Sequence, residues 1–377
     1  MHLTRHVAVL ATTVVGTAIA LAAPAAASPL SPTPGSGVVF VQTDAQAANH
    51  VVAYDRAANG ALTQAGSYAT GGAGGALTGA VVDLTASQGA LTADRDAALL
   101  YAVNAGSNTI SVFGVDGDQL HLDQVVGSGG TFPVSISVHG NQVYVLNARD
   151  GGSIQGYRRH AGQLEAVPAW HRTLGLNPSA TPEFTHTPGQ VAFTPDGRHL
   201  VVTTKAASNS ILVFNIDRGD ELADAPVVRA ETGTVPFAVA FDARAHLQVA
   251  DAGTNAVSTY DVARDGSLTF LGSTATGQRA TCWIASSGDL LAASNAGSAT
   301  VSTLVATAAG APTLITATAA GPGTVDASFT PDGRYLYVQG GGTGEVDAFS
   351  VNGDATLTPI GSATVPNAVG GEGIVAW

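Results

Sequence analysis

Leu99-Leu-Tyr-Ala-Val-Asn-Ala-Gly-Ser-Asn-Thr-Ile-Ser-Val-Phe113 is the stretch of sequence that decides the fold. Both of its ends are rich in apolar, β-branched and aromatic residues, which is typical of two short strands. The Asn-Ala-Gly-Ser-Asn between them consists of residues that favour turns, and several of these tolerate a positive φ. The stretch therefore predicts two antiparallel strands joined by a tight turn.

Degraded copies of this hairpin recur along the chain. Their first strands are Val143–Asn147, His199–Thr203, His246–Asp251, Leu290–Asn295 and Tyr335–Gln339. A second strand follows each of them after a short turn, as in Asn209–Phe214 and Thr254–Tyr260. A repeat of about 45 residues built only from short strands is the sequence signature of a β-propeller. We therefore predict an all-β fold with seven blades.

The two ends of the chain predict how the ring of blades closes. The first copy, which begins at Val38, lacks an innermost strand, whereas Gly373–Trp377 is left over as a spare strand at the C-terminus. Pairing the two would remove both exposed edges of an open ring. We therefore expect a seven-bladed β-propeller closed by pairing of the C-terminal strand with the first blade.

Composition agrees with this fold and excludes several functions. Only 11% of residues are charged and 45% are hydrophobic, so most strands should be covered on both faces. The net charge of −13 argues against nucleic-acid binding, which needs clustered Lys and Arg. The sequence contains no phosphate-binding loop, dinucleotide fingerprint, zinc spacing or Gly-x-Ser-x-Gly motif. We therefore predict no cofactor and no metal, and we expect a monomer.

The N-terminus has the pattern of a targeting segment. Arg5 and His6 precede the apolar run Val7–Ala23, and Ala25-Ala-Ala27 supplies the small residues of a cleavage site. We predict a signal peptide over 1–27, a Pro-rich linker over 28–37 and the propeller over 38–377. The protein is then expected to be secreted, with no membrane span once the leader is removed. The alternative is an uncleaved anchor helix.

Two carboxylates stand out at a position that recurs near the start of each innermost strand, two residues beyond the opening proline. This position holds Ser135, Gln190, Ala238, Thr281, Asp326 and, on the closing strand, Glu372. Innermost strands begin at one mouth of the channel, so the two carboxylates are expected to meet there. Their repulsion would raise one pKa toward a value suited to a general base. The alternative is that each carboxylate bonds to the backbone of a neighbouring blade.

Four further residues complete the predicted site. Lys205 interrupts a position otherwise held by Asn or Asp, and Arg279 replaces the opening proline of the sixth blade. Each is interpreted as holding an anionic substrate, with a solvated surface charge as the alternative. His186 ends the insertion Ala169–His186, which is either a binding face or a structural loop. The predicted catalytic residues are Glu372, Asp326 and His186, and the predicted substrate-binding residues are Lys205, Arg279 and Gln190.

Two weaker signals have a structural and a functional interpretation. Asn104, Asn147, Asp251 and Asn295 occupy one position of the repeat and are interpreted as turn residues, or alternatively as Ca²⁺ ligands at the channel mouth. Cys282 is the only cysteine, so it cannot form an intrachain disulfide. Its neighbour is Trp283, and we interpret the thiol as buried packing, with a nucleophilic role as the alternative.

The sequence resembles a known family. Phe193-Thr-Pro-Asp-Gly-Arg198 and Phe329-Thr-Pro-Asp-Gly-Arg334 are similar to turns of the bacterial lactonase family of seven-bladed propellers, which includes 6-phosphogluconolactonases and fungal carboxymuconate cyclases. Tyr101–Phe113 and Thr281-Cys-Trp-Ile284 also resemble its secreted members. The resemblance covers essentially the whole mature chain. It implies opening or closing of a lactone ring on small acidic sugars or diacids.

The chain departs from the family where the resemblance would place its site. Members read Pro-Arg-His at the start of the fifth blade, where this chain has Pro236-Phe-Ala238, and Asn-Glu where it has Asp251-Ala252. Only His186 matches the paired histidines of the fourth blade. Three functions remain open: an exported hydrolase of a small lactone, a non-catalytic propeller that binds a small ligand or a protein at one face, and a cell-surface structural array. The expected partner is a small anionic or lactone ligand.

The leader generates the first testable prediction. We expect the protein recovered from a culture supernatant to begin at or near Ser28, because Ala25-Ala-Ala27 offers the small side chains that a signal peptidase needs. N-terminal sequencing of the secreted chain measures this directly. Recovery of the full-length chain in the membrane fraction alone would contradict it.

Overall fold

The computed structural model describes residues 1–2 and 36–377. The predicted signal peptide, apart from Met1 and His2, and most of the predicted linker lie outside the described residues. The description below concerns the compact unit 33–377, from residue 36 onward. Within the described part of the chain, no helix combines the length and apolar character needed to span a bilayer.

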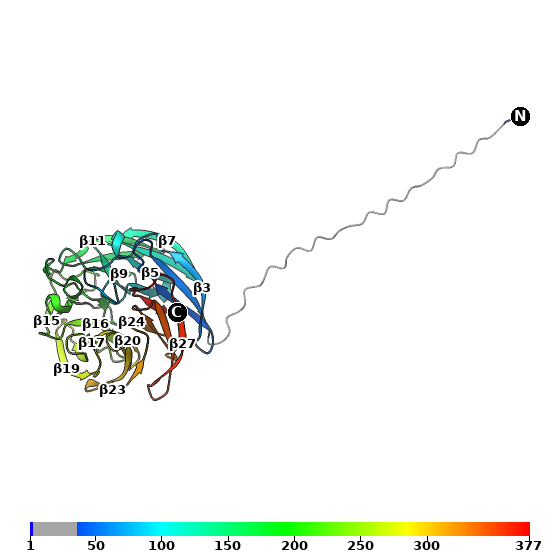
Figure 1. Ribbon diagram of the computed structural model, residues 1–377. Coiled ribbons are helices and arrows are strands. Elements are labelled where there is room, and N and C mark those ends of the chain that lie inside the picture. The colour runs from blue at the N-terminus through cyan, green and yellow to red at the C-terminus, as the bar shows by residue number, and fades with distance from the viewer. Residues whose placement is uncertain (3–35) are drawn as a thin grey trace. The chain divides into compact units, whose positions relative to one another are not determined.

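Seven four-stranded sheets surround a common axis, as predicted from the repeat (Figure 1). Every strand pairing in them is antiparallel, and the outermost strands lie at the periphery of the view in Figure 1. Blade 1 contains β28 (Ile374–Ala376), β1 (Gly37–Gln42), β2 (His50–Arg56) and β3 (Leu62–Ala69). Blade 2 contains β4 (Leu91–Asp94), β5 (Leu99–Asn104), β6 (Thr109–Asp116) and β7 (Gln119–Gly127). Blade 3 contains β8 (Pro133–His139), β9 (Gln142–Asn147), β10 (Ser153–His160) and β11 (Gln163–Thr173).

The other four blades repeat the same order from the axis outward. Blade 4 contains β12 (Val191–Phe193), β13 (His199–Thr203), β14 (Ser210–Asn215) and β15 (Val227–Ala230). Blade 5 contains β16 (Pro236–Phe241), β17 (Leu247–Asp251), β18 (Ala256–Val262) and β19 (Leu268–Ala275). Blade 6 contains β20 (Thr281–Ser287), β21 (Leu290–Asn295), β22 (Thr300–Thr307) and β23 (Gly310–Ala319). Blade 7 contains β24 (Thr324–Phe329), β25 (Tyr335–Gly340), β26 (Glu345–Val351) and β27 (Leu357–Thr364).

Four short 3₁₀ helices lie in the connections: η1 (Arg95–Ala97), η2 (Ala105–Ser107), η3 (Glu183–Thr185) and η4 (Lys205–Ala207). The deciding hairpin is formed as predicted, with Leu99 opposite Gly114 and Asn104 opposite Thr109. The turn between its strands contains η2, and Asn108 ends it with a φ of 56°. Asn is among the residues that adopt this left-handed conformation most readily.

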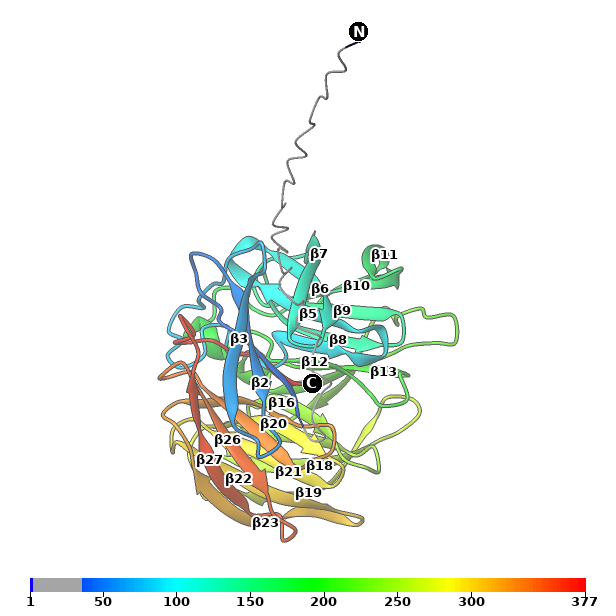
Figure 2. The same ribbon diagram turned by 90° about the vertical axis from the view of Figure 1, so that its right-hand side faces the viewer.

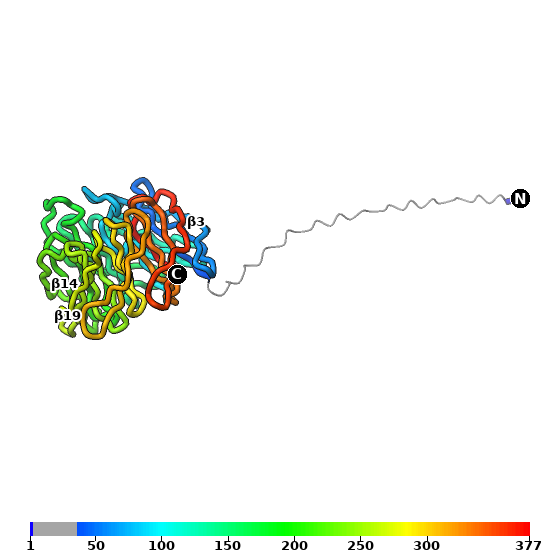
Figure 3. Tube along the Cα trace, turned by 60° about the horizontal axis from the view of Figure 1, so that its bottom comes forward, coloured from blue at the N-terminus to red at the C-terminus, as the bar shows by residue number. Residues whose placement is uncertain are grey.

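The ring closes through the C-terminal strand, as predicted. In β28, Ile374, Val375 and Ala376 pair antiparallel with Val41, Phe40 and Val39 of β1. The pairing extends at both ends, where the Gln42 amide donates to the Gly373 carbonyl at 2.8 Å and the Trp377 amide donates to the Val38 carbonyl at 2.7 Å. Figures 2 and 3 show the C-terminal end of the chain beside the first blade. The first and last strands of the propeller are therefore tied into one sheet.

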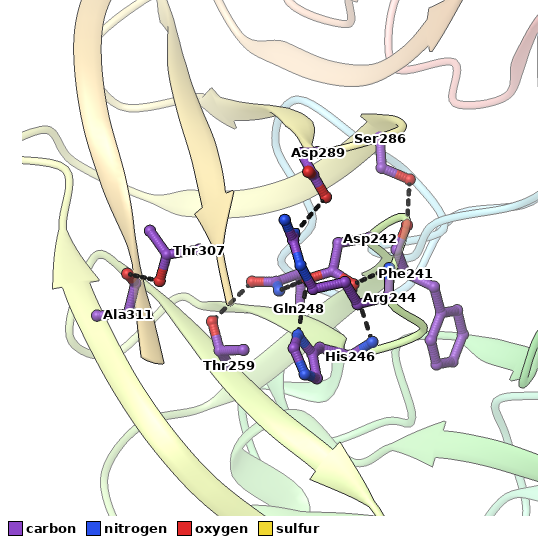
Figure 4. Close-up of polar contacts among 10 residues, drawn as sticks. All are labelled: Phe241, Asp242, Arg244, His246, Gln248, Thr259, Ser286, Asp289, Thr307 and Ala311. Carbon is purple, nitrogen blue, oxygen red and sulfur yellow. Dashed lines mark hydrogen bonds and ion pairs between the residues drawn. The ribbon is translucent and has the colours of Figure 1, made fainter. Parts of the chain in front are cut away.

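Tight turns connect the first and second strands of the blades at the end of the propeller opposite the predicted site. In blade 4 the Thr194 hydroxyl donates to Asp196 at 2.8 Å and accepts from the His199 amide at 3.1 Å. Blade 5 has Asp242 in place of the threonine, and this carboxylate accepts from the His246 amide at 2.9 Å and contacts the His246 ring nitrogen Nδ1 at 3.0 Å (Figure 4). Different side chains thus close equivalent turns.

The recurrent Asn position serves the blades themselves. Asn104 and Asn295 each donate from Nδ2 to a serine hydroxyl on the adjoining strand, at 2.8 and 3.0 Å. Asp251 holds the same position in blade 5 and accepts from Ser258. Burial raises the pKa of Asp251 to about 7, so below that pH its carboxyl carries a proton, as an asparagine amide does. Asn104 also accepts from the Asn49 side-chain amide of blade 1 at 3.2 Å, so this position supports packing within and between blades.

Ring closure generates the second prediction. Deleting Gly373–Trp377 should lower the melting temperature by more than about 10 °C or prevent soluble expression, because a buried Ile or Val contributes roughly 1.5–3 kcal/mol and the deletion also leaves β1 as an open edge. Removing Trp377 alone leaves β28 in place and is the matched control. Thermal unfolding measures both, and an unchanged melting temperature in the longer deletion would contradict the closure.

Candidate functional site

The position two residues beyond the strand-opening proline joins neighbouring blades. The Ser135 hydroxyl of blade 3 accepts a hydrogen bond from the Val191 amide of blade 4, at 3.2 Å. Gln190 of blade 4 accepts from the Val239 amide of blade 5, at 2.6 Å. Each side chain thus satisfies an amide on the innermost strand of the next blade, where no further strand is available as a partner.

Asp326 and Glu372 perform the same task at the closing point of the ring. Asp326 of blade 7 accepts from the Ile374 amide of blade 1 at 3.3 Å. Glu372 accepts from the amides of Gly89 and Ala90, at the entrance to blade 2, at 2.8 and 3.1 Å. The structure therefore places both predicted carboxylates at one channel mouth, with the interblade hydrogen bonds that the sequence offered as the alternative.

The two carboxyl groups are buried close enough to shift each other's pKa. Glu372 is 0% and Asp326 5% exposed. Two neighbouring buried carboxyl groups resist carrying a charge at the same time. Burial raises the pKa of Asp326 to about 6, and burial together with the charge of Asp326 holds the pKa of Glu372 well above its usual range.

A segment that the sequence analysis left without a role closes this mouth. Residues 71–90 connect β3 to β4, and we call them the channel loop. Ser87 donates from its hydroxyl to the Val134 carbonyl of blade 3 at 2.9 Å, and its own carbonyl accepts from the Trp283 indole of blade 6 at 2.6 Å. Gln88 exchanges two hydrogen bonds with the Ile284 backbone of blade 6, at 2.8 and 2.9 Å. The channel loop therefore bonds to opposite sides of the ring.

The channel loop brings a third carboxylate to the mouth. Asp83 accepts from the Thr85 amide at 2.8 Å, from the Thr85 hydroxyl at 2.7 Å and from the Ser87 amide at 2.8 Å, and it is 3% exposed. A fourth, Asp44, accepts from the Glu372 amide at 2.8 Å. Burial raises the pKa of Asp44 to about 7 and also raises that of Asp83. Only the length and glycine content of residues 71–90 signalled an unusual connection.

Lys205 lies beneath the loops, not on the surface. Its ammonium group donates to the carbonyl oxygens of Ala86 and Phe184, both at 2.6 Å, and to the Thr187 hydroxyl at 2.9 Å. Burial lowers its pKa to about 7, partly offset by the charge of Asp83. The lysine therefore ties the channel loop to the insertion, and all three of its protons are used.

The remaining predicted residues are spread over the same face. Gln190 is buried in the interblade bond described above. Arg279 is exposed on the sixth blade, where its guanidinium donates to the Gly297 carbonyl at 3.1 Å. His186 is half-buried, and its Nδ1 lies 2.9 Å from the Pro182 carbonyl. In the described part of the chain, no hydrogen bond or ion pair joins Arg279 or His186 to the Asp326–Glu372 pair.

His186 instead lines a pocket. Ala169–Thr173 continue the outer strand β11, so the insertion proper begins after Thr173. Together with residues 148–151, which follow β9, it encloses a cavity of about 130 Å³ that we call the insertion pocket. Arg149 and Glu183 form its wall as a two-point ion pair, at 2.7 and 3.2 Å. This bond lowers the pKa of Glu183 to about 2. The sequence analysis singled out the insertion but not residues 148–151.

Within the described residues, no group of three or more His, Cys, Asp or Glu side chains is arranged to hold a metal ion. Cys282 is buried, and burial raises the pKa of its thiol to about 12. A thiol with so high a pKa is protonated at neutral pH and is a poor nucleophile. The chemistry available at the channel mouth is therefore that of the buried carboxyl groups.

The chain belongs to the family described as "Lactonase, 7-bladed beta-propeller", whose model matches residues 38–172 and 230–373. The unmatched residues 173–229 contain the insertion and most of blade 4. A search of curated proteins gave no match.

Solved structures share the fold at low identity. A protein of Bacteroides fragilis described as a candidate 6-phosphogluconolactonase superposes with a TM-score of 0.71 at 20% identity, covering 92% of this chain and 99% of its own. The periplasmic gluconolactonase PpgL of Pseudomonas aeruginosa superposes with a TM-score of 0.69 at 17% sequence identity, covering 90% of this chain and 98% of its own. Virginiamycin B lyase of Staphylococcus aureus superposes with a TM-score of 0.53 at 12% sequence identity, covering 78% of this chain and 89% of its own. These likenesses establish the fold alone.

The acid cluster generates the third prediction. A carboxyl whose pKa is raised on folding contributes stability that is present below its unfolded pKa of about 4 and is lost as the pH rises through its folded value. For Asp326 and Asp44 the folded values are about 6 and about 7, so the loss falls between pH 4 and 7. The pKa of Lys205 is lowered to about 7, so this group adds no opposing change below pH 7.

We expect the melting temperature to fall by at least about 5 °C between pH 5 and pH 7. The variant Glu372→Gln removes one of the paired acids. Its melting temperature should fall clearly less than that of wild type between pH 5 and pH 7. Asp354→Asn, an exposed carboxylate on blade 7, is the matched control and should retain the wild-type fall. Equal falls in wild type and Glu372→Gln would show that the buried pair does not control this pH dependence.

Proposed function

We propose that this chain is an exported propeller of the lactonase family that binds a ligand without turning it over. The observation that carries the proposal is the interblade role of Asp326 and Glu372. Asp326 accepts from the innermost strand of blade 1 and Glu372 from the end of the channel loop that leads into blade 2, at the position where Ser135 and Gln190 accept from neighbouring blades. A carboxyl group engaged in this way has a complete structural explanation.

Access supports the same proposal. A general base must come within about 3 Å of the proton it removes, directly or through one water. Glu372 is 0% exposed, and the amides of Gly89 and Ala90, from the channel loop, occupy its two oxygens. Lys205 was predicted from the sequence to hold an anionic substrate. Its ammonium group instead donates hydrogen bonds to Ala86, Phe184 and Thr187. A substrate would have to displace the channel loop to reach either group.

Hydrolysis of a small lactone is the second candidate, and one observation favours it. Asp326 and Glu372 are buried side by side, and burial raises the pKa of Asp326 to about 6 and that of Glu372 well above its usual range, as suits groups that activate water at neutral pH. In that case His186 would assist catalysis, and Lys205, Arg279 and Gln190 would hold the substrate once the channel loop had moved. The two candidates differ in whether that movement occurs.

An assay against 6-phosphogluconolactone, gluconolactone and unbranched aliphatic lactones separates the two candidates. We expect the purified mature chain to hydrolyse none of them above the buffer rate, and Glu372→Gln to be indistinguishable from wild type. Hydrolysis that Glu372→Gln abolishes, in a variant that retains a cooperative thermal transition, would overturn the proposal in favour of the hydrolase. In that case Lys205→Ala should mainly raise KM, as for a group that binds ground and transition states alike.

A further inference from the structure

The insertion pocket has the features of a ligand site separate from the channel mouth. Ala148, Gly151 and Thr187 at its base are buried, whereas Asp150 and Asn177 at its rim are exposed. Its volume of about 130 Å³ exceeds what one or two waters require and suits a single small molecule. The insertion that forms one side of it lies in residues 173–229, outside the segments matched to the family.

The walls of the insertion pocket are fixed before any ligand arrives. The Leu176 amide donates to the Gly151 carbonyl at 2.9 Å and ties the insertion to the loop after β9. Glu183 accepts from the Thr78 amide at 2.7 Å, and Arg149 donates to the Ala76 carbonyl at 3.1 Å, so the channel loop supports the wall from behind. A site held in this way loses little entropy when it binds.

Hydrogen-bonding capacity in the insertion pocket is biased toward acceptors. The Nδ1 of His186 lies 2.9 Å from both the Pro182 carbonyl and the Thr185 hydroxyl, and in the tautomer that donates to the carbonyl the Nε2 atom is an acceptor. Asp150 and Glu183 add carboxylate oxygens. The one cationic side chain of the lining, Arg149, already donates to Glu183 and to Ala76. The amide of Asn177 and the hydroxyl of Thr187, which accepts from Lys205, can still donate, so the lining suits a ligand whose groups both donate and accept.

Charge narrows the ligand further. Arg149 and Glu183 neutralise each other in their ion pair, which leaves the carboxylate of Asp150 as the uncompensated charge of the lining. The carboxylate of an anionic ligand would bring only acceptors and would be repelled by Asp150. A neutral ligand with several hydroxyl groups meets both conditions, and Leu176 and Pro178 offer apolar surface to its C–H face.

We propose that the insertion pocket binds a neutral polyol of monosaccharide size. This inference rests on the proposed binding function and names its site and its ligand class. The neutral polyol replaces the small anionic ligand that was expected from Lys205 and Arg279. The ammonium group of Lys205 already donates its protons to the two loops, and Arg279 lies exposed on the sixth blade.

The test is titration calorimetry of the mature chain with neutral glucose, galactose, mannose and xylose, with gluconate as the acidic probe and glucosamine as the cationic probe. We expect at least one neutral sugar to bind with a Kd between about 0.1 and 10 mM, and gluconate to bind at least tenfold more weakly. Binding of gluconate alone, of glucosamine alone, or of no neutral sugar in that range would overturn the proposal.

Two variants locate the binding. His186→Ala removes an acceptor and should raise the Kd for the neutral sugar by roughly tenfold. Asp150 has a φ of 58°, a conformation that Asn also tolerates, so Asp150→Asn should fold normally. Its Kd values for the neutral sugar and for gluconate should lie closer together than those of wild type. The control Asp354→Asn should change neither value. If both pocket variants bind as wild type does, the ligand lies elsewhere and the inference is wrong.

This outcome is distinguishable from failure of the proposed function. Lactone hydrolysis dependent on Glu372 would contradict the non-catalytic proposal whatever the sugars do. Absence of sugar binding without hydrolysis would remove only the assignment of site and ligand. The two assays use the same purified chain and share no probe.

Discussion

The innermost edge of each blade imposes the constraint on which the rest of this structure depends. A strand at the centre of a propeller pairs with its own blade on one side only, so backbone amides on the other side need partners that cannot come from its sheet. Here the neighbouring blade supplies them through one recurrent side chain. Serine, glutamine, aspartate and glutamate each take that role at different points of the ring. An acceptor oxygen at the right reach is the requirement, and charge is incidental to it.

Blade 5 shows what happens when the recurrent side chain is absent. Ala238 occupies the position there and cannot accept a hydrogen bond. The Ile284 amide on the following innermost strand bonds instead to Gln88 of the channel loop at 2.8 Å. The channel loop thus completes a set of interblade bonds that the repeat leaves unfinished, which explains why it crosses the mouth of the channel. Closing the mouth and completing the ring are one structural task.

The sequence was sufficient to predict the fold because each blade is specified by a short, contiguous stretch of residues. Each hairpin has its own apolar periodicity and its own turn residues, and seven imperfect copies reinforce one another. The closing strand could also be predicted, because the first copy lacks a strand and Gly373–Trp377 had no other place. The neighbourhood of Asp326 and Glu372 followed from the repeat as well, since equivalent positions in adjacent blades must lie close together around the axis.

The burial of that pair could not be predicted from the same pattern. Asp83 and Gln88 belong to a connection without periodicity, and their partners lie in blades 6 and 7 or in the loop itself. Likewise, the repeat placed Lys205 near the mouth but could not show that three oxygen atoms from two loops would surround its ammonium group. Contacts of this kind depend on how irregular segments pack, which a repeat does not encode.

A distinction between the two loops of this face follows from what each binds. The channel loop is held by the blades across the axis, and its polar groups are consumed within the protein. The insertion is held at its base by Gly151, Arg149 and Lys205, while its rim remains open to solvent. Polar groups that are fixed in position and still reachable are those that can recognise a ligand. In this protein they belong to the insertion and to the loop after β9, whereas the polar groups of the channel loop are bonded within the protein.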